Sequence, residues 1–208
     1  MPKSIINKSS GNSNPEETGF GGSYGFVIVP DANTKTKTEN LARELFPKAE
    51  YQATTPHVTL YQGRVAGLPP DEVRKILNKL KGYSGETLAL DLIDIYGGKF
   101  AFWNNEKNTN LSLMHTTALE IAAYLDKNTI QRSVEEGLDM SPEELENVRK
   151  FGYPFVGESY RPHLTLAYDG QGLTLPAGSL SRPWRMKIED VLFVKMGKYG
   201  SVAEVIEI

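Results

Sequence analysis

Two short segments of this sequence repeat one pattern, and that repeat constrains the fold more than any other feature. Residues 57–60 and 163–166 both read His-x-Thr-Leu, and each segment follows a proline. Two of the chain's three histidines carry the pattern, which chance would produce in on the order of one case in several thousand. Residues two apart on a strand point to the same face. The repeat therefore predicts two similar strands, each anchored by aliphatic side chains on one face and presenting an imidazole and a hydroxyl on the other.

Apolar periodicity in the rest of the chain predicts a mixture of strands and helices. Strands are expected at residues 24–29, 57–62, 87–96, 99–103, 111–113, 163–168, 186–196 and 202–208. Helices are expected at residues 37–46, 70–81 and 117–125, and a short helix begins at 141–142, where a serine cap precedes a proline. This order indicates an α+β fold with an antiparallel sheet and helices packed on its outside.

A single domain is expected to account for residues 23–208, because a chain of this length buries a sizeable core. Residues 1–22 are rich in Ser, Asn and Gly and lack apolar periodicity, which is typical of a flexible arm. Residues 128–158 are acidic and lower in apolar content, and we interpret them as an insertion or a lid over the core. Residues 169–183 are rich in Gly, Pro and Ser and are expected to form a loop.

The composition excludes several kinds of protein. The chain has no cysteine, which rules out disulfides, thiolate metal sites and a cysteine nucleophile. Its formal net charge of −3 argues against a surface that tracks nucleic acid throughout. No segment approaches the ~20 apolar residues of a membrane span, and the first residues lack the apolar core of a signal peptide. We therefore expect a cytoplasmic protein with no membrane partner and no obligate protein partner.

Two imidazole–hydroxyl pairs that face one another would suit a phosphodiester substrate. Histidine titrates near neutral pH, so His57 and His163 can act as acid and base. The hydroxyls of Thr59 and Thr165 can donate to the non-bridging phosphate oxygens and stabilise their growing charge. The sequence shows no cluster of His, Asp and Glu at metal-ligand spacing, so neither a metal nor another cofactor is expected.

These paired motifs, separated by about half of the chain, resemble the 2H phosphoesterase superfamily, which includes 2'-5' RNA ligase-like proteins and cyclic nucleotide phosphodiesterases. The resemblance spans residues 24–208, and its specific part is the two tetrapeptides. It implies a bilobal fold, with two antiparallel sheets and outer helices around a central cleft. The cleft would be lined by the four motif residues His57, Thr59, His163 and Thr165.

The same resemblance implies metal-independent hydrolysis of 2',3'-cyclic phosphates of nucleotides or RNA ends. The substrate would then be a nucleotide, a cyclic nucleotide or a short oligonucleotide. Proteins of this kind use their two histidines asymmetrically. We expect His163 to take a proton from water and His57 to protonate the leaving ribose oxygen, although the sequence does not distinguish this from the reverse.

Four other side chains near the motifs are candidates for substrate binding. Tyr61 and Tyr168 follow the motifs and could stack on a base or donate a hydroxyl, or else pack in the core. Trp103 could form a platform for a base, but core burial is favoured. Arg161 precedes the second motif and could neutralise a phosphate or only lie on the surface. The remaining histidine, His115, comes just before an expected helix cap and is expected to be structural.

Two other functions remain open at this point. A phosphodiesterase that cleaves 2'-5' or 3'-5' linkages in oligonucleotide signals would use the same residues. A non-catalytic nucleotide-binding module would keep the fold, but binding alone does not need both imidazoles. The compounds that are turned over would distinguish these possibilities.

Overall fold

The computed structural model of the chain describes residues 19–126, 140–175 and 178–208. Its strands are β1 (Phe20–Pro30), β2 (Tyr51–Gln52), β3 (Val58–Leu68), β4 (Thr87–Tyr96), β5 (Phe100–Asn105), β6 (His163–Tyr168), β7 (Ser179–Met196) and β8 (Val202–Val205). Its α-helices are α1 (Ala32–Leu45), α2 (Pro70–Lys81), α3 (Thr109–Ala118) and α5 (Pro142–Phe151). Short 3-10 helices follow at η1 (Leu119–Tyr124), η3 (Gly157–Ser159) and η4 (Lys198–Gly200). The expected α+β class with antiparallel pairing is confirmed.

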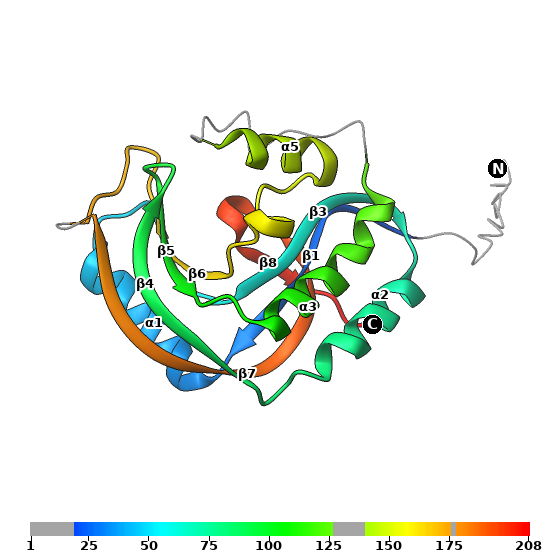
Figure 1. Ribbon diagram of the computed structural model, residues 1–208, viewed down its shortest axis with the longest axis horizontal. Helices are drawn as coiled ribbons and strands as arrows, with labels where there is room; N and C mark the ends of the chain where they lie inside the picture. The colour runs from blue at the N-terminus through cyan, green and yellow to red at the C-terminus, as the bar shows by residue number, and fades with distance from the viewer. Residues whose placement is uncertain (1–18, 127–139, 176–177) are drawn as a thin grey trace, which may run out of the picture.

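A single curved sheet forms the frame of the molecule, with helices around it (Figure 1). The strand order is β1-β3-β6-β5-β4-β7-β8. The long strand β7 pairs with β4 through its first half and with β1 through its second half. The two sheets implied by the resemblance are therefore joined into one, both through β7 and through the motif strands β3 and β6, which are neighbours in the strand order.

The packing of α2 shows how the helices hold the sheet. Its residues Val73, Ile76, Leu77 and Leu80 recur at helical spacing and are all buried, which gives the helix one apolar face. That face belongs to the same core cluster as the aliphatic residues of both motifs, namely Val58, Leu60, Leu164 and Leu166, which have no solvent exposure. Burial of one such side chain contributes roughly 1.5–3 kcal/mol, so each motif strand is firmly anchored on that face.

Several local expectations were wrong, including the helix start at residue 117, because helix α3 already runs over Thr109–Ala118. Residues 111–113 belong to helix α3, not to a strand, because the Asn108 side chain caps the helix by accepting the Leu111 N–H at 2.8 Å. Strand β7 begins at Ser179, inside the expected loop, because its first residues pair with β4. Strand β1 begins at Phe20, inside the expected arm, because it pairs with the end of β3. The rest of that arm, residues 1–18, and residues 127–139 of the expected insertion lie outside the described residues.

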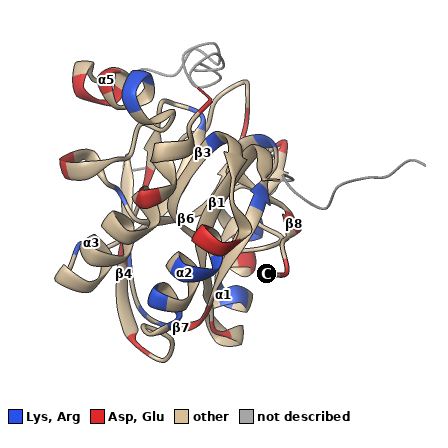
Figure 2. Ribbon diagram, turned by 90° about the vertical axis from the view of Figure 1, so that its right-hand side faces the viewer, with Lys and Arg blue, Asp and Glu red and all other residues tan. Residues whose placement is uncertain are grey.

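In two of the helices, α2 and α5, the charged side chains follow the helix dipole. In α2 and α5 the first turn carries acidic residues and the last turn carries basic ones, as Figure 2 shows for α5. This arrangement stabilises each helix through its macrodipole. Within the described ranges, no helix combines the length and apolar character that crossing a bilayer requires.

Candidate active site

Strands β3 and β6 pair antiparallel where Val58 lies opposite Leu164. Neighbouring residues step in opposite directions along an antiparallel pair, so each motif histidine lies beside the threonine of the other motif. Both paired aliphatic residues point into the core, which directs the residues on either side of them to the other face. The structure thus groups on one face the four side chains predicted from the sequence, His57, Thr59, His163 and Thr165.

Both imidazoles are anchored in the same way. Nδ1 of His57 lies 2.8 Å from the carbonyl oxygen of Thr55, and Nδ1 of His163 lies 2.7 Å from the carbonyl oxygen of Arg161. A carbonyl oxygen only accepts hydrogen bonds, so the proton in each contact belongs to Nδ1. In both motifs the acceptor lies two residues before the histidine. Each ring is therefore oriented by its own backbone, with Nε2 as the nitrogen left for chemistry.

The surroundings of the two Nε2 atoms differ. Nε2 of His57 lies 3.0 Å from the carbonyl oxygen of Gly200, so both nitrogens of this ring face acceptors, an arrangement that only the doubly protonated imidazole satisfies. Nε2 of His163 has no hydrogen-bond partner within the described part of the chain. The His163 ring stacks on Phe102, with 3.6 Å between centroids, and meets Phe155 edge-on at 5.6 Å.

Both rings are 8% exposed, and this burial governs their protonation. The pKa of His163 is lowered to about 3, chiefly by burial and also by the nearby charges of Arg161 and His57, while the hydrogen bond to the Arg161 carbonyl opposes the shift. Burial also lowers the pKa of His57, but the carbonyls of Thr55 and Gly200 favour its charged form. His163 is therefore the ring that stays neutral, and His57 is the ring with acceptors for two protons.

A β-bulge follows each motif. In β3, Thr59 pairs with Val27 and Tyr61 pairs with Phe26, which leaves Leu60 as an extra residue. In β6 the same shift falls between Thr165 and Ala167, opposite Phe102 and Ala101. The residues from Val58 to Gln62 and from Leu164 to Tyr168 consequently share one burial pattern, with the third and fourth positions buried and the second and fifth partly exposed. The two motif strands are thus alike beyond the tetrapeptide.

The bulges determine which flanking residues reach the face of the sheet that carries His57, Thr59, His163 and Thr165, which we call the motif face. Strict alternation would turn Tyr168 away from His163, but the bulge turns it back, so that it contacts Phe100 at 4.7 Å and stacks on Tyr199 at 4.1 Å. Gln62 holds the corresponding position in β3, and its Oε1 is buried without a hydrogen-bond partner among the described residues. Sequence reasoning missed Gln62, although aligning the five residues after each histidine would have paired it with Tyr168.

Two of the four candidates for substrate binding, Tyr61 and Trp103, take the other role that the sequence left open for them and pack in the core. Tyr61 is moved off the motif face by the bulge and is fully buried, and its hydroxyl donates to the Phe151 carbonyl at 2.7 Å. Trp103 is also fully buried, and its indole N–H is shared between the carbonyls of Asp91 and Arg182. Because both polar groups are satisfied inside the protein, neither side chain is available to a ligand.

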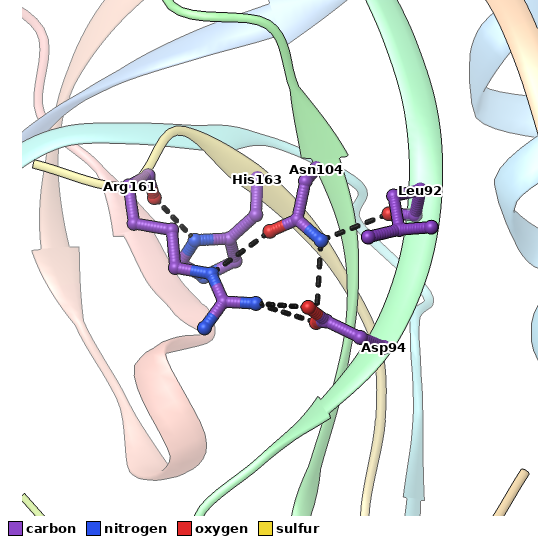
Figure 3. A network of polar contacts seen from close by, with 5 residues as sticks. All are labelled: Leu92, Asp94, Asn104, Arg161 and His163. Atoms are coloured by element: carbon purple, nitrogen blue, oxygen red, sulfur yellow. Dashed lines mark hydrogen bonds and ion pairs between the residues drawn. The ribbon is translucent and has the colours of Figure 1, made fainter. Parts of the chain in front are cut away.

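Arg161 lies on the motif face, but its charge is already paired. Its guanidinium binds both carboxylate oxygens of Asp94 and the side-chain oxygen of Asn104 (Figure 3). It therefore neither reaches across the site nor carries a free positive charge. His115, in contrast, has the expected structural role: it is buried, its Nδ1 donates to the Leu60 carbonyl and its Nε2 accepts the Gly157 N–H.

Two segments cover the imidazoles. The stretch after α5 brings Phe155 against His163 and Phe102, and α5 lies across the upper side of the sheet in Figure 1. The β7–β8 loop, residues 197–201, brings Gly200 against His57. A cavity of about 240 Å³ opens beside His57, and its mainly apolar lining includes Val27, Val29, Pro56, Leu192, Val202 and Val205. Among residues 19–126, 140–175 and 178–208, no group of three His, Asp or Glu side chains could hold a metal ion.

Several solved structures have a similar arrangement of strands. A structure of TT0787 from Thermus thermophilus is 16% identical, with a TM-score of 0.58 over 89% of this chain and 95% of that chain. A structure described as a phosphoesterase is 16% identical, with a TM-score of 0.55 over 90% of this chain and 97% of that chain. The chain has the 2H phosphoesterase fold. E. coli LigT with NADP+ is a further 2H phosphoesterase neighbour, 16% identical with a TM-score of 0.52 over 90% of this chain and 96% of that one.

Sequence comparisons add less than the fold does. A family model described as a protein of unknown function (DUF1045) matches residues 96–172. That match includes the second His-x-Thr-Leu motif, and it begins after the first motif. Comparison with curated proteins gives no significant match.

Proposed function

We propose that this protein is a phosphodiesterase that hydrolyses 2',3'-cyclic phosphates of nucleotides or RNA ends by metal-independent acid–base catalysis. The observation that carries the proposal is the matched anchoring of the two imidazoles, in which Nδ1 of each ring donates to the carbonyl two residues earlier. Each ring also lies beside the threonine of the other motif, as the pairing of Val58 with Leu164 requires. A site built only to bind a nucleotide has no need for two imidazoles fixed in this manner.

In the proposed reaction, Nε2 of His163 takes a proton from water while the water oxygen forms a bond to phosphorus. The bond from phosphorus to one ribose oxygen breaks, and His57 donates its Nε2 proton to that oxygen. The hydroxyls of Thr59 and Thr165 donate to the non-bridging oxygens, where charge develops. The lowered pKa of His163, at about 3, supports its role as the neutral base. The two carbonyl acceptors around His57 support its role as the acid.

Nucleotide ligands are supported by what proteins of this fold have been solved with. Structures of E. coli LigT contain NADP+, ATP and 3'-AMP, at TM-scores of 0.52, 0.52 and 0.51 to this chain. The net charge of −3 favours a short substrate over a long polyanion, whose binding needs many basic contacts. A nucleoside cyclic phosphate satisfies both conditions.

Turnover of defined compounds tests this proposal. The protein is incubated with 2',3'-cyclic AMP and with a 2'-5' linked diadenylate, with EDTA present throughout. We expect hydrolysis of the cyclic phosphate, and a loss of on the order of 10²–10⁴-fold in kcat for His57→Ala and for His163→Ala. A matched pair at the phosphate-binding position sharpens the test, because Thr165→Ser keeps the hydroxyl and Thr165→Val removes it. Only the valine variant should lose activity substantially.

Each other outcome has a definite meaning. Turnover that survives either alanine substitution would exclude the two-histidine mechanism. Cleavage of the diadenylate alone would assign the site to 2'-5' linkages in oligonucleotide signals. Binding of nucleotide with no turnover of either compound would identify a non-catalytic module.

A further inference from the structure

A polar network spans three neighbouring strands beside His163 (Figure 3). Asp94 on β4 accepts from Arg161 Nη2 through both carboxylate oxygens, at 2.5 and 2.6 Å. Asn104 on β5 accepts from Arg161 Nε at 2.9 Å. The amide nitrogen of Asn104 then donates to the Leu92 carbonyl at 2.8 Å and to Asp94 at 3.2 Å. Because the partners of Arg161 are fixed on two paired strands, its guanidinium is held in one place.

This network ends on the imidazole of His163 from two directions. The carbonyl oxygen of Arg161 accepts the Nδ1–H of His163 at 2.7 Å, which sets the tautomer. The guanidinium of Arg161 lies over the ring of Phe102 at 5.5 Å, and Phe102 stacks on His163 at 3.6 Å. Arg161 thus contacts the edge of the imidazole directly through its backbone carbonyl, and it supports the face of the ring indirectly through Phe102.

The contacts between Arg161 and Asp94 are more buried, and their hydrogen bonds stronger, than in an ordinary surface ion pair. The side chains of Arg161 and Asp94 are 31% and 25% exposed, and hydrogen bonds between charged groups are roughly twice as strong as neutral ones. His57 has no equivalent support, because the carbonyl that accepts its Nδ1–H belongs to Thr55, an exposed residue. The network therefore distinguishes one histidine from the other.

We propose that Asp94 and Asn104 are positioning residues for His163, and that they act through Arg161 to hold the imidazole in the Nδ1–H tautomer with Nε2 directed at the reacting phosphate. The catalytic consequence rests on the proposed function. The tautomer itself is a property of the folded protein and is measured without substrate.

The test compares Asp94→Ala and Asp94→Asn with Asp91→Ala. Asp91 is a matched control on the same strand, since its carboxylate accepts from Ser181 and has no contact with Arg161. Nitrogen NMR of the imidazole reports the His163 tautomer, and steady-state kinetics separate kcat from KM. We expect Asp94→Ala to reduce the Nδ1–H population and to lower kcat on the order of tenfold to a hundredfold with KM within about twofold. Asp94→Asn keeps one acceptor and should lie between Asp94→Ala and the unchanged protein.

Arg161→Lys keeps the charge and the carbonyl but loses the planar fork, and it provides the test if Asp94→Ala does not fold. An unchanged His163 tautomer and unchanged kcat in both Asp94→Asn and Arg161→Lys would overturn the proposal. Equal losses in the Asp91→Ala control would also overturn it, because the effect would then belong to the sheet as a whole. If no compound is turned over but the tautomer shifts as described, the positioning role stands and the proposed function fails.

Discussion

At the scale of single residues, the two imidazoles are anchored in the same way but differ in the group that lies next to Nε2. The His57 nitrogen contacts the carbonyl of Gly200 at 3.0 Å, whereas the His163 ring lies between two phenylalanines. A carbonyl oxygen favours a protonated nitrogen and an apolar wall favours a neutral ring. Under the proposed function, these environments would suit His57 to the role of acid and His163 to the role of base, although the tetrapeptides that carry them are nearly identical.

The pH dependence of kcat/KM follows from this difference. A base is active when deprotonated, and the pKa of His163 at about 3 keeps it so above that value. An acid is active when protonated, and burial lowers the pKa of His57 below its ordinary value of 6.5. Activity of the free enzyme should therefore fall as the pH rises through the pKa of His57, with an optimum on the acidic side of neutrality. The sequence alone indicated acid–base work near neutral pH.

A pH profile of kcat/KM on 2',3'-cyclic AMP measures this expectation. Stability across the same pH range, followed by circular dichroism, separates loss of activity from unfolding. An optimum at or above about pH 7 would contradict the assigned protonation states.

The common face of the four motif residues could be predicted from the sequence, because residues two apart on a strand point to the same side. The roles of Tyr61 and Trp103 could not, because they depend on where each side chain finds a partner for its polar atom. Tyr61 donates to the Phe151 carbonyl and Trp103 to two carbonyls on neighbouring strands. Such partners come from distant segments, and no local pattern reports them.

At the scale of elements, the β-bulges explain the main error about the motif strands. Strict alternation of side chains would place Tyr61 on the face of His57 and Tyr168 on the opposite face from His163. One extra residue in each strand reverses both expectations, since side-chain direction has a period of two. Neither Leu60 nor Leu166 carries a sequence signal for a bulge, so this feature could only be found in the structure.

The β7–β8 loop is the element that most directly limits access to His57. Tyr199 has a positive φ of 58°, stacks on Tyr168 at 4.1 Å and donates its hydroxyl to Glu50. These contacts hold the loop where the Gly200 carbonyl meets Nε2. Under the proposed function, a phosphate would have to displace that carbonyl from Nε2, so the closed loop would oppose substrate binding.

Tyr199→Ala should therefore raise kcat/KM for the cyclic phosphate. The alanine variant loses the ring contacts with Tyr168 and Tyr51, and since each such pair contributes about 1 kcal/mol to the closed loop, a gain of roughly fivefold or more is expected. Tyr199→Phe keeps the ring and loses only the hydroxyl contact with Glu50, so it should change kcat/KM much less. A fall in kcat/KM for the alanine variant would show that Tyr199 contacts the substrate, and would refute the blocking role.

At the scale of the whole molecule, the sequence predicted the class and the order of elements but not the continuity of the sheet. The run from 186 to 196 reads as a strand, whereas residues 179–185, with their serines, arginines and proline, do not. Those residues adopt a strand conformation because they pair with β4. Strand β7 is therefore 18 residues long and connects both halves of the sheet. Tertiary pairing thus overrides local propensity, and β7 together with the β3–β6 pairing turns two expected sheets into one.

The three histidines of the chain all contribute to how stability responds to acid. The pKa of each of His57, His115 and His163 is lowered in the folded protein, chiefly by burial. Their pKa in the unfolded chain is near 6.5, so between that value and the folded pKa the unfolded state binds more protons. The free energy of unfolding therefore falls as the pH drops from about 6.5, and for His163 it continues to fall towards about 3.

A histidine variant isolates this contribution from that of the carboxylates. His163→Gln removes one titrating group and keeps an amide that can donate to the Arg161 carbonyl. Urea unfolding at about pH 7, 6 and 5 should show a shallower loss of stability for the variant, by roughly 1 kcal/mol per pH unit below the unfolded pKa. The same slope in both proteins would mean that the imidazole of His163 is open to protonation in the folded state, and the buried, neutral base assigned to it would have to be abandoned.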